Sequence, residues 1–358
     1  MDYKSKELRE EALALKLHHR GPCVYFRGLI EISNKCCKNC LYCGIRSGNR
    51  GVERYEMSDE EVMREALFAH EAGYGSVAIQ GGERCDSQFV ERITRLVHNI
   101  HKQYGLGITL SLGEQPLQVY KEWFAAGASR YLLRIEASNP DLYRLIHPDD
   151  GQGRHSYDSR VSALHDLKSA GYLLGSGVMI GLPFQTYAHL EEDLQFLKEI
   201  GVDMAGMGPY IPHKDTPLGK IVEFWKSGNS SLETLPADLQ ALAMLPRGDF
   251  WNFSDDRLLD LSIDMVARLR ILMPHINIAA TTALQVLNPD GREMALLSGA
   301  NVIMPNMTET EFRGNYSLYE GKQGVADDAA ATRDSLLLNL DKLGIPVGWR
   351  EKGDWRHV

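Results

Sequence analysis

The sequence predicts an α/β fold, a closed (β/α)8 barrel. Two observations carry the prediction. Short apolar runs rich in β-formers alternate along the chain with longer amphipathic helical runs. Eight such strand–helix units fit into 358 residues, a length typical of this barrel with insertions. An open, doubly wound sheet shows the same alternation, and the count of eight favours the closed barrel.

Each element has its own local signal. The expected strands are Val24–Ile32, Ser76–Ile79, Ile108–Leu112, Arg130–Leu133, Leu173–Ile180, Met204–Met207, Ile276–Ala280 and Asn301–Met304. The expected helices are Ser58–Ala72, Ser87–Tyr104, Leu117–Ala126, Ser159–Ala170, Tyr187–Ile200, Asp255–Leu272, Arg292–Ser298 and Ala330–Leu343. Ser58 and Glu61 match a capping box at the start of the first helix. Helices end on a glycine, as a left-handed C-cap requires, at Gly73, Gly127, Gly171, Gly201, Gly299 and Gly344.

Three segments organise the chain. We expect an N-terminal helical segment over residues 1–22, the barrel over 23–323, and a C-terminal helix and tail over 324–358 that close it. A long segment at about 212–254 interrupts the alternation between the sixth strand and its helix. So long a connection in a compact domain is functional or mobile, and in a barrel it lies at the active-site face. A surface embellishment is the alternative.

Charge and hydropathy narrow the classes of partner. The net charge is −9 and no cluster of Lys and Arg is present, which argues against a nucleic-acid partner. No apolar stretch approaches the roughly 20 residues of a membrane span. The first residues carry charges at helical spacing and lack the apolar core of a signal peptide. We therefore expect a cytoplasmic protein with no nucleic-acid and no membrane partner.

Four of the six cysteines fall within eight residues. Cys36, Cys40 and Cys43 have the spacing C-x3-C-x2-C directly after the first strand. Three thiolates can hold a [4Fe–4S] cluster and leave its fourth iron open, whereas an electron-transfer cluster normally has four. A structural zinc site would need a second Cys/His pair, but the next histidine, His70, lies in a helix. Cys37 is an alternative first ligand, although the spacing favours Cys36.

This loop, with Tyr42 directly before its last cysteine, resembles the radical S-adenosylmethionine (SAM) superfamily. A turn that follows the second strand, Gly81-Gly82-Glu83, strengthens the resemblance. In that superfamily such a turn presents backbone carbonyls to the ammonium group of SAM. The resemblance therefore implies two cofactors, a [4Fe–4S] cluster on the three cysteines and SAM, which is cleaved to methionine and a 5′-deoxyadenosyl radical.

Nearly the whole chain is similar to the HydE family, the radical maturases of [FeFe]-hydrogenase. Matching stretches include "GLPFQT" (Gly181–Thr186), "GPYIPHKDTPL" (Gly208–Leu218) and "GREMALLSGANVIMPN" (Gly291–Asn306). Methylornithine synthase and biotin synthase share the barrel, but the last two stretches are more similar to HydE.

Two departures from the HydE pattern stand out. HydE members often carry an accessory cluster on three C-terminal cysteines, and the matching positions here are Gly324, Thr332 and Ser335. We therefore expect no second cluster. The insertion at about 212–254 is also longer than in the family.

The HydE resemblance implies a SAM-binding set beyond the turn. The matching positions are Thr109, Ser111, Arg134, Glu136 and Arg160. Arg134 and Glu136 end the fourth strand two residues apart, so they share a face. An arginine there suits a bidentate bond to the methionine carboxylate. The alternatives are a plain Arg134–Glu136 ion pair and a solvated Arg160 on its helix.

The resemblance also implies a substrate-binding set. The matching positions are Arg27, Thr281, Thr282 and Tyr319. Arg27 shares a strand face with Leu29 and Glu31, and unpaired charges there favour the lumen over the helix layer. We expect this face to hold an anionic substrate. The alternative for the two threonines is that they are good strand formers and no more.

The resemblance implies a reaction and its partners. The small-molecule substrate would be an iron–carbonyl–cyanide–cysteine complex, attacked at its cysteine sulfur by the adenosyl radical. An electron donor such as ferredoxin or flavodoxin and other hydrogenase maturases would be its partners. Two other functions stay open: a radical enzyme acting on an amino acid, like methylornithine synthase, and a non-catalytic iron–sulfur carrier or scaffold.

Overall fold

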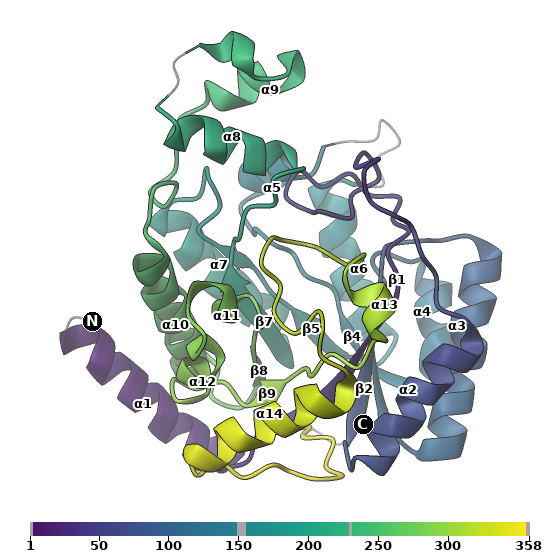
Figure 1. Cartoon of the computed structure of the whole chain (residues 1–358). Helices are drawn as coiled ribbons and strands as arrows, with labels where there is room; N and C mark the ends of the chain where they lie inside the picture. The colour runs from purple at the N-terminus through teal and green to yellow at the C-terminus, as the bar shows by residue number, and fades with distance from the viewer. Residues whose placement is uncertain (1–2, 149–154, 229–230, 356–358) are drawn as a thin grey trace.

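The computed structural model describes residues 3–148, 155–228 and 231–355, and shows a closed parallel barrel (Figure 1). Its strands are β1 (Tyr25–Ser33), β2 (Ser76–Gly81), β3 (Gly107–Ser111), β4 (Ala128–Leu132), β5 (Leu173–Ser176), β6 (Met179–Ile180), β7 (Met204–Pro209), β8 (Asn277–Ala280) and β9 (Val302–Ile303). Neighbours in the barrel pair in parallel, and the pairing of β5 with β7 closes it. The prediction of a closed barrel is confirmed.

The fifth expected strand is divided into β5 and β6, both of which pair with β7. Between them, Gly177 lies so close to the next strand that a Cβ atom would stand 1.9 Å from the carbonyl oxygen of Gly206. Glu136, in the loop after β4, donates its backbone N–H to the Gly177 oxygen at 3.0 Å. The regular strand is therefore interrupted at Gly177, whose carbonyl oxygen binds the loop that follows β4.

The outer helices agree with the sequence prediction to within about two residues at each end. They are α2 (Asp59–Glu71), α3 (Ser87–Tyr104), α4 (Leu117–Ala126), α6 (Tyr157–Ser169), α7 (Tyr187–Ile200), α10 (Asp255–Leu272), α12 (Gly291–Leu296) and α14 (Ala329–Lys342). The capping box of Ser58 and Glu61 is present. All six predicted helix-ending glycines have positive φ. Within the described residues, no helix combines the length and the apolar character needed to cross a bilayer.

One long helix and three short helices complete the fold. The long one is α1 (Tyr3–Arg20), and the short ones are α5 (Pro140–Ile146), α11 (Leu284–Leu287) and α13 (Thr310–Arg313). The sequence did not lead us to α5, although Asn139 caps it and Pro140 stands in its first turn, both of them helix-start signals.

The long connection after β7 forms a helical unit, uppermost in Figure 1. It contains α8 (Pro217–Lys226), the 3-10 turn η1 (Leu232–Thr234) and α9 (Ala237–Ala243), and residues 229–230 of it lie outside the described residues. Its buried side chains pack with Leu142 and Phe184 in a small core of their own. Arg247 stacks over Trp225 and Trp251 at 5.0 and 4.3 Å from the ring centroids. The unit follows β7 and therefore lies at the end of the barrel formed by the carboxyl ends of the strands.

The C-terminal tail after α14 lies under the opposite end of the barrel. Val347 pairs with Val24 beside β1. Farther along, Asp354 forms an ion pair with Arg130 of β4 and lies 3.8 Å from a guanidinium nitrogen of Arg27. Both arginines are buried, with 3% and 1% of their surface exposed. Burial, and then repulsion from Arg130, lower the pKa of Arg27 to about 9. The tail carboxylate thus supplies the counter-charge for the barrel floor.

Removing this counter-charge should destabilise the protein. We expect Asp354→Asn to lower the free energy of unfolding by about 3 kcal/mol, because the change leaves buried arginine charge unpaired. Urea titration followed by circular dichroism measures the loss. Asp341→Asn, at an exposed position of α14, is the matched control and should change stability by less than about 0.5 kcal/mol. Equal stability of the two variants would contradict the assigned role of Asp354.

Candidate active site

A cavity of about 370 Å³ opens at the carboxyl ends of the strands, where barrel enzymes have their active sites. It brings together most of the sequence-predicted site residues from seven separate parts of the chain. Those that line it are Cys36, Cys40, Tyr42, Cys43, Gly81, Gly82, Glu83, Ser111, Arg134, Glu136, Arg160, Thr281, Thr282 and Tyr319.

Two predicted residues lie elsewhere. Arg27 faces the barrel interior, as the alternation along β1 predicts, but it lines a separate pocket at the barrel floor, and Thr109 lines the same pocket. Met204 borders both spaces, and Arg27 contacts its sulfur at 2.6 Å. The structure therefore does not bring Arg27 to Thr281, Thr282 and Tyr319, nor Thr109 to the SAM set. The reason is the position of each residue along its strand. Arg27 lies two residues before Leu29 on β1, nearer the floor of the barrel, and Leu29 is the residue of this face that lines the upper cavity.

The three motif cysteines share one wall of the cavity, while Cys37 is exposed and does not line it. Their three sulfur atoms do not all lie within 4.8 Å of one another. Thiolates on one tetrahedral zinc stand about 3.8 Å apart. In a [4Fe–4S] cluster, by contrast, each of the three thiolates binds a different iron.

The cysteine environment favours the neutral thiol in the absence of iron. Burial, and then repulsion from Cys36, raise the pKa of Cys40 to about 12. Burial also raises the pKa of Cys43 well above its ordinary value. Binding of iron to the loop must therefore release protons.

Arg54 holds the shape of the cysteine loop. Its guanidinium donates to the carbonyl oxygens of Asn34, Ile45, Arg46 and Asn49 at 2.6 to 3.0 Å. These bonds join the end of β1 to the chain beyond Cys43. Sequence reasoning missed this role, because an arginine gives no local signal that it will serve distant carbonyls.

The glycine turn after β2 interlocks with the loop. A Cβ atom on Gly82 would stand 2.3 Å from the Lys35 carbonyl oxygen, so only glycine fits. Glu83 donates its backbone N–H to the Cys36 sulfur at 3.3 Å, and its carbonyl accepts from Cys37 N–H at 3.0 Å. The turn therefore sets the position of the first cysteine.

A buried network of charges connects the loop to two further barrel units. Lys38 lies 3.2 Å from both Glu83 and Glu114, and Arg160 of α6 pairs with Glu114. Lys38, which the sequence did not single out, and Arg160, which the sequence left open, are both less than 10% exposed. Burial alone would raise the pKa of Glu114, but Arg160 and Lys38 hold it below its ordinary value. The alternative of a solvated Arg160 is wrong.

Arg134 and Glu136 form a bidentate pair at the cavity wall. Nε and Nη2 of Arg134 donate to the two carboxylate oxygens of Glu136 at 2.8 Å each. Glu136 holds a φ of 65°, an unusual conformation for a non-glycine residue that often marks functional sites. The bidentate face predicted for the methionine carboxylate is thus occupied by Glu136, which leaves Nη1 of Arg134 as the donor for a further ligand.

Tyr42 is fixed by a histidine that the sequence analysis did not single out. Its hydroxyl lies 2.9 Å from Nε2 of His147, whose Nδ1 lies 3.0 Å from the Tyr143 carbonyl oxygen. Nδ1 therefore donates, and Nε2 accepts from Tyr42. Burial holds the pKa of His147 well below its usual range, so the ring is neutral.

Another ion pair positions the C-terminal loop that carries Tyr319. Lys322 contacts both oxygens of Glu31, at the end of β1, at 2.6 and 2.8 Å, and also donates to the Tyr316 carbonyl at 3.1 Å. Asn306 donates to the same carboxylate at 3.0 Å. The loop is thereby attached to the strand that leads into the cysteine motif.

A three-cysteine loop at the mouth of a closed barrel, interlocked with a Gly-Gly-Glu turn, defines a radical SAM enzyme with a [4Fe–4S] cluster and SAM as cofactors. The model of the radical SAM superfamily matches residues 30–197. The chain is 40% identical, over 94% of its length and 85% of the relative's, to the [FeFe] hydrogenase maturase subunit HydE of Thermotoga maritima. The chain belongs to the HydE family.

Solved structures agree on the fold. A crystal structure of methylornithine synthase superposes with a TM-score of 0.76 at 20% identity, covering 98% of this chain and 91% of that one. The [FeFe]-hydrogenase maturase HydG of Carboxydothermus hydrogenoformans superposes with a TM-score of 0.71 at 19% identity, covering 96% and 72%. At these identities the likeness supports the barrel alone.

The cluster ligands can be tested directly. We expect Cys36→Ala, Cys40→Ala or Cys43→Ala to prevent assembly of a cluster of about four irons and to abolish formation of 5′-deoxyadenosine. Iron analysis and chromatography of the anaerobic, dithionite-reduced reaction measure the two effects. Cys37→Ala is the matched control and should retain both. Equal loss in that variant would show that Cys37 is a ligand.

The Lys322–Glu31 pair can be tested by its effect on the loop. We expect Lys322→Met to speed amide hydrogen exchange across residues 316–322 at least about tenfold, since Glu31 then lacks its cation. Lys322→Arg should restore part of the protection. Lys342→Met, on the exposed face of α14, should leave the loop unchanged. Unaltered exchange in Lys322→Met would show that other contacts hold the loop.

Proposed function

We propose that this protein is a maturase for the active-site cluster of [FeFe]-hydrogenase, acting on a small iron–carbonyl–cyanide–cysteine complex. The observation that carries the proposal is the cavity that the cysteine loop, the SAM set other than Thr109, and Thr281, Thr282 and Tyr319 line together. The 40% identity to a HydE maturase supports the substrate class. Identity to the 3-methylornithine synthase of Methanosarcina barkeri is lower, at 25%, which favours the maturase over the amino-acid mutase.

Different residues of the cavity would bind the cluster and SAM. Cys36, Cys40 and Cys43 would hold the cluster, which when reduced supplies the electron that cleaves SAM to methionine and a 5′-deoxyadenosyl radical. Nη1 of Arg134 would donate to the methionine carboxylate, while Glu136 keeps the guanidinium in place. The carbonyls of Gly81 and Gly82 would accept from its ammonium group.

The remainder of the wall protects the radical. Leu29, Met179, Met204 and Ile211 line the cavity among the polar groups, and an apolar wall excludes water and limits side reactions. The substrate would meet the hydroxyl groups of Thr281, Thr282 and Tyr319 on the side of the cavity built by β8 and the C-terminal loop. The hydroxyls of Thr282 and Tyr319 would donate to anionic or cyanide groups without adding charge, whereas the Thr281 hydroxyl donates to the Met207 carbonyl oxygen at 3.3 Å.

The proposal includes partners. A low-potential donor such as ferredoxin or flavodoxin would reduce the cluster, and other hydrogenase maturases would exchange substrate and product with this enzyme in the cytoplasm. Neither a membrane nor a nucleic acid enters the proposed reaction.

Complementation tests the proposal. Expression of this chain in cells that lack HydE should restore hydrogenase activity, whereas its Cys43→Ala variant should not. Formation of 5′-deoxyadenosine in vitro without complementation would indicate a different substrate, such as an amino acid. Absence of 5′-deoxyadenosine from the fully reconstituted protein would favour the non-catalytic carrier.

A further inference from the structure

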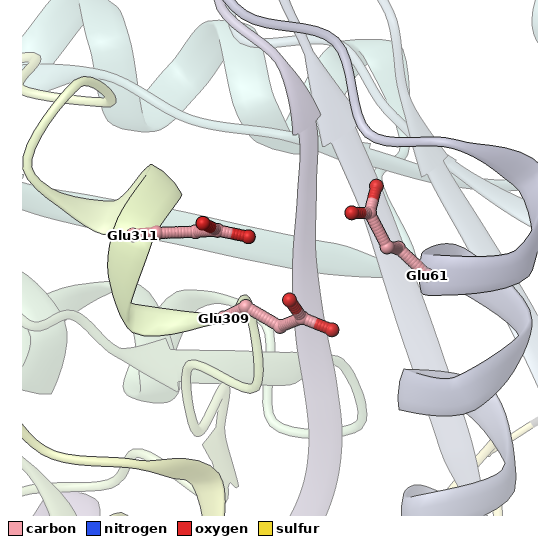
Figure 2. A group of neighbouring side chains, drawn as sticks. All are labelled: Glu61, Glu309 and Glu311. Atoms are coloured by element: carbon pink, nitrogen blue, oxygen red, sulfur yellow. The ribbon is translucent and has the colours of Figure 1, made fainter.

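Three glutamates converge on the outside of the barrel, away from the active-site cavity. Glu61 comes from the first turn of α2, and Glu309 and Glu311 lie at the start of α13. One carboxylate oxygen of each lies within 4.8 Å of the others, and Figure 2 shows the side chains pointing toward one another. Like charges at this distance repel, so the arrangement calls for a cation.

A fourth carboxylate independently points to the same ligand. Glu65 lies one helical turn beyond Glu61 on the same face of α2 and shares a cavity of about 490 Å³ with Glu309 and Glu311. It is only 7% exposed and forms no hydrogen bond or ion pair with any described residue. Burial, and then repulsion from Glu309, raise its pKa to about 7. Arg313 and Arg64 act in the opposite direction but form no bond with Glu65, and a buried carboxylate that lacks a hydrogen-bonded partner is costly.

The arginines nearby do not satisfy this charge. Arg64 pairs with Glu309 at 2.9 Å, but its side chain is 63% exposed and it contacts only Oε1, so Oε2 remains available. Such exposed pairs are weak. Glu61 uses Oε2 to accept from Ser58 N–H, which leaves Oε1. Arg313 is buried, and its guanidinium donates to backbone carbonyls and a hydroxyl, with no bond to a carboxylate.

We propose that Glu61, Glu309 and Glu311 bind a hard divalent cation, Ca²⁺ in preference to Mg²⁺, with Glu65 as a further ligand or counter-charge. An all-carboxylate set selects Ca²⁺, Mg²⁺ or Mn²⁺ over zinc, which favours nitrogen and sulfur. Ligands from two separate segments, completed by water, suit the irregular six- to eight-fold coordination of Ca²⁺ better than the strict octahedron of Mg²⁺.

The cation would connect two parts of the molecule that matter to the active site. Helix α2 follows the cysteine loop, and α13 precedes the loop of Tyr316 and Tyr319, both of which line the cavity. A ligand that binds only the folded state stabilises it by mass action. The bound cation would therefore hold the C-terminal loop against the barrel without touching the reaction.

Calorimetric titration of the cluster-loaded, chelator-treated protein with CaCl₂ tests the site. We expect one Ca²⁺ per chain, a melting temperature that rises saturably with Ca²⁺, and weaker binding of Mg²⁺. Glu311→Gln should weaken Ca²⁺ binding at least about tenfold and remove the thermal shift, because Glu311 is exposed and its loss leaves the fold intact. Glu71→Gln, at an exposed position farther along α2, removes the same charge and should bind as the wild type does.

Three results with the wild type, Glu311→Gln or zinc would overturn the proposal. They are no saturable binding by the wild type, equal affinity in Glu311→Gln, and tighter binding of Zn²⁺ than of Ca²⁺. Equal weakening by Glu71→Gln would likewise show that general negative charge, and not these carboxylates, attracts the ion.

Discussion

The buried charge network of Lys38, Glu83, Glu114 and Arg160 is the constraint on which the active site depends. These four residues come from the cysteine loop, the turn after β2, the loop after β3 and helix α6. Each charge is removed from water and would be costly alone. Each of these charges finds an opposite charge when the four elements come together. The network therefore fixes the relative positions of the elements that surround the cluster and SAM.

Two further interactions extend this constraint around the cavity. Arg54 fixes the backbone of the cysteine loop from one side, and Lys322 attaches the C-terminal loop to Glu31 from the other. At the opposite end, Asp354 of the tail supplies the charge that Arg130 and Arg27 require. The barrel is thus held by buried ion pairs at both ends, while its walls are held by apolar contacts between strands and helices.

The order of elements was open to prediction because it depends on local signals. Periodicity, capping residues and glycine positions act within a few residues of one another, and they placed α3, α4, α7 and α10 at their observed bounds. The division of the fifth strand was missed because it depends on Gly206, a residue of the next barrel unit. The ligand pattern of the cysteines was also local, as was the Gly-Gly-Glu turn.

The sequence by itself therefore determined the barrel, the cysteine motif, both cofactors and the inward face of β1. Only the tertiary structure decided where each inward-facing residue lies along the barrel axis, between the floor and the mouth. This position along the axis separates Arg27 and Thr109 at the floor from Thr281, Thr282 and Tyr319 at the mouth. It also decided which charges pair, so that Glu136 occupies the bidentate face of Arg134. The physical reason is that strand stagger and charge pairing are set by residues far apart in the chain, which no local pattern records.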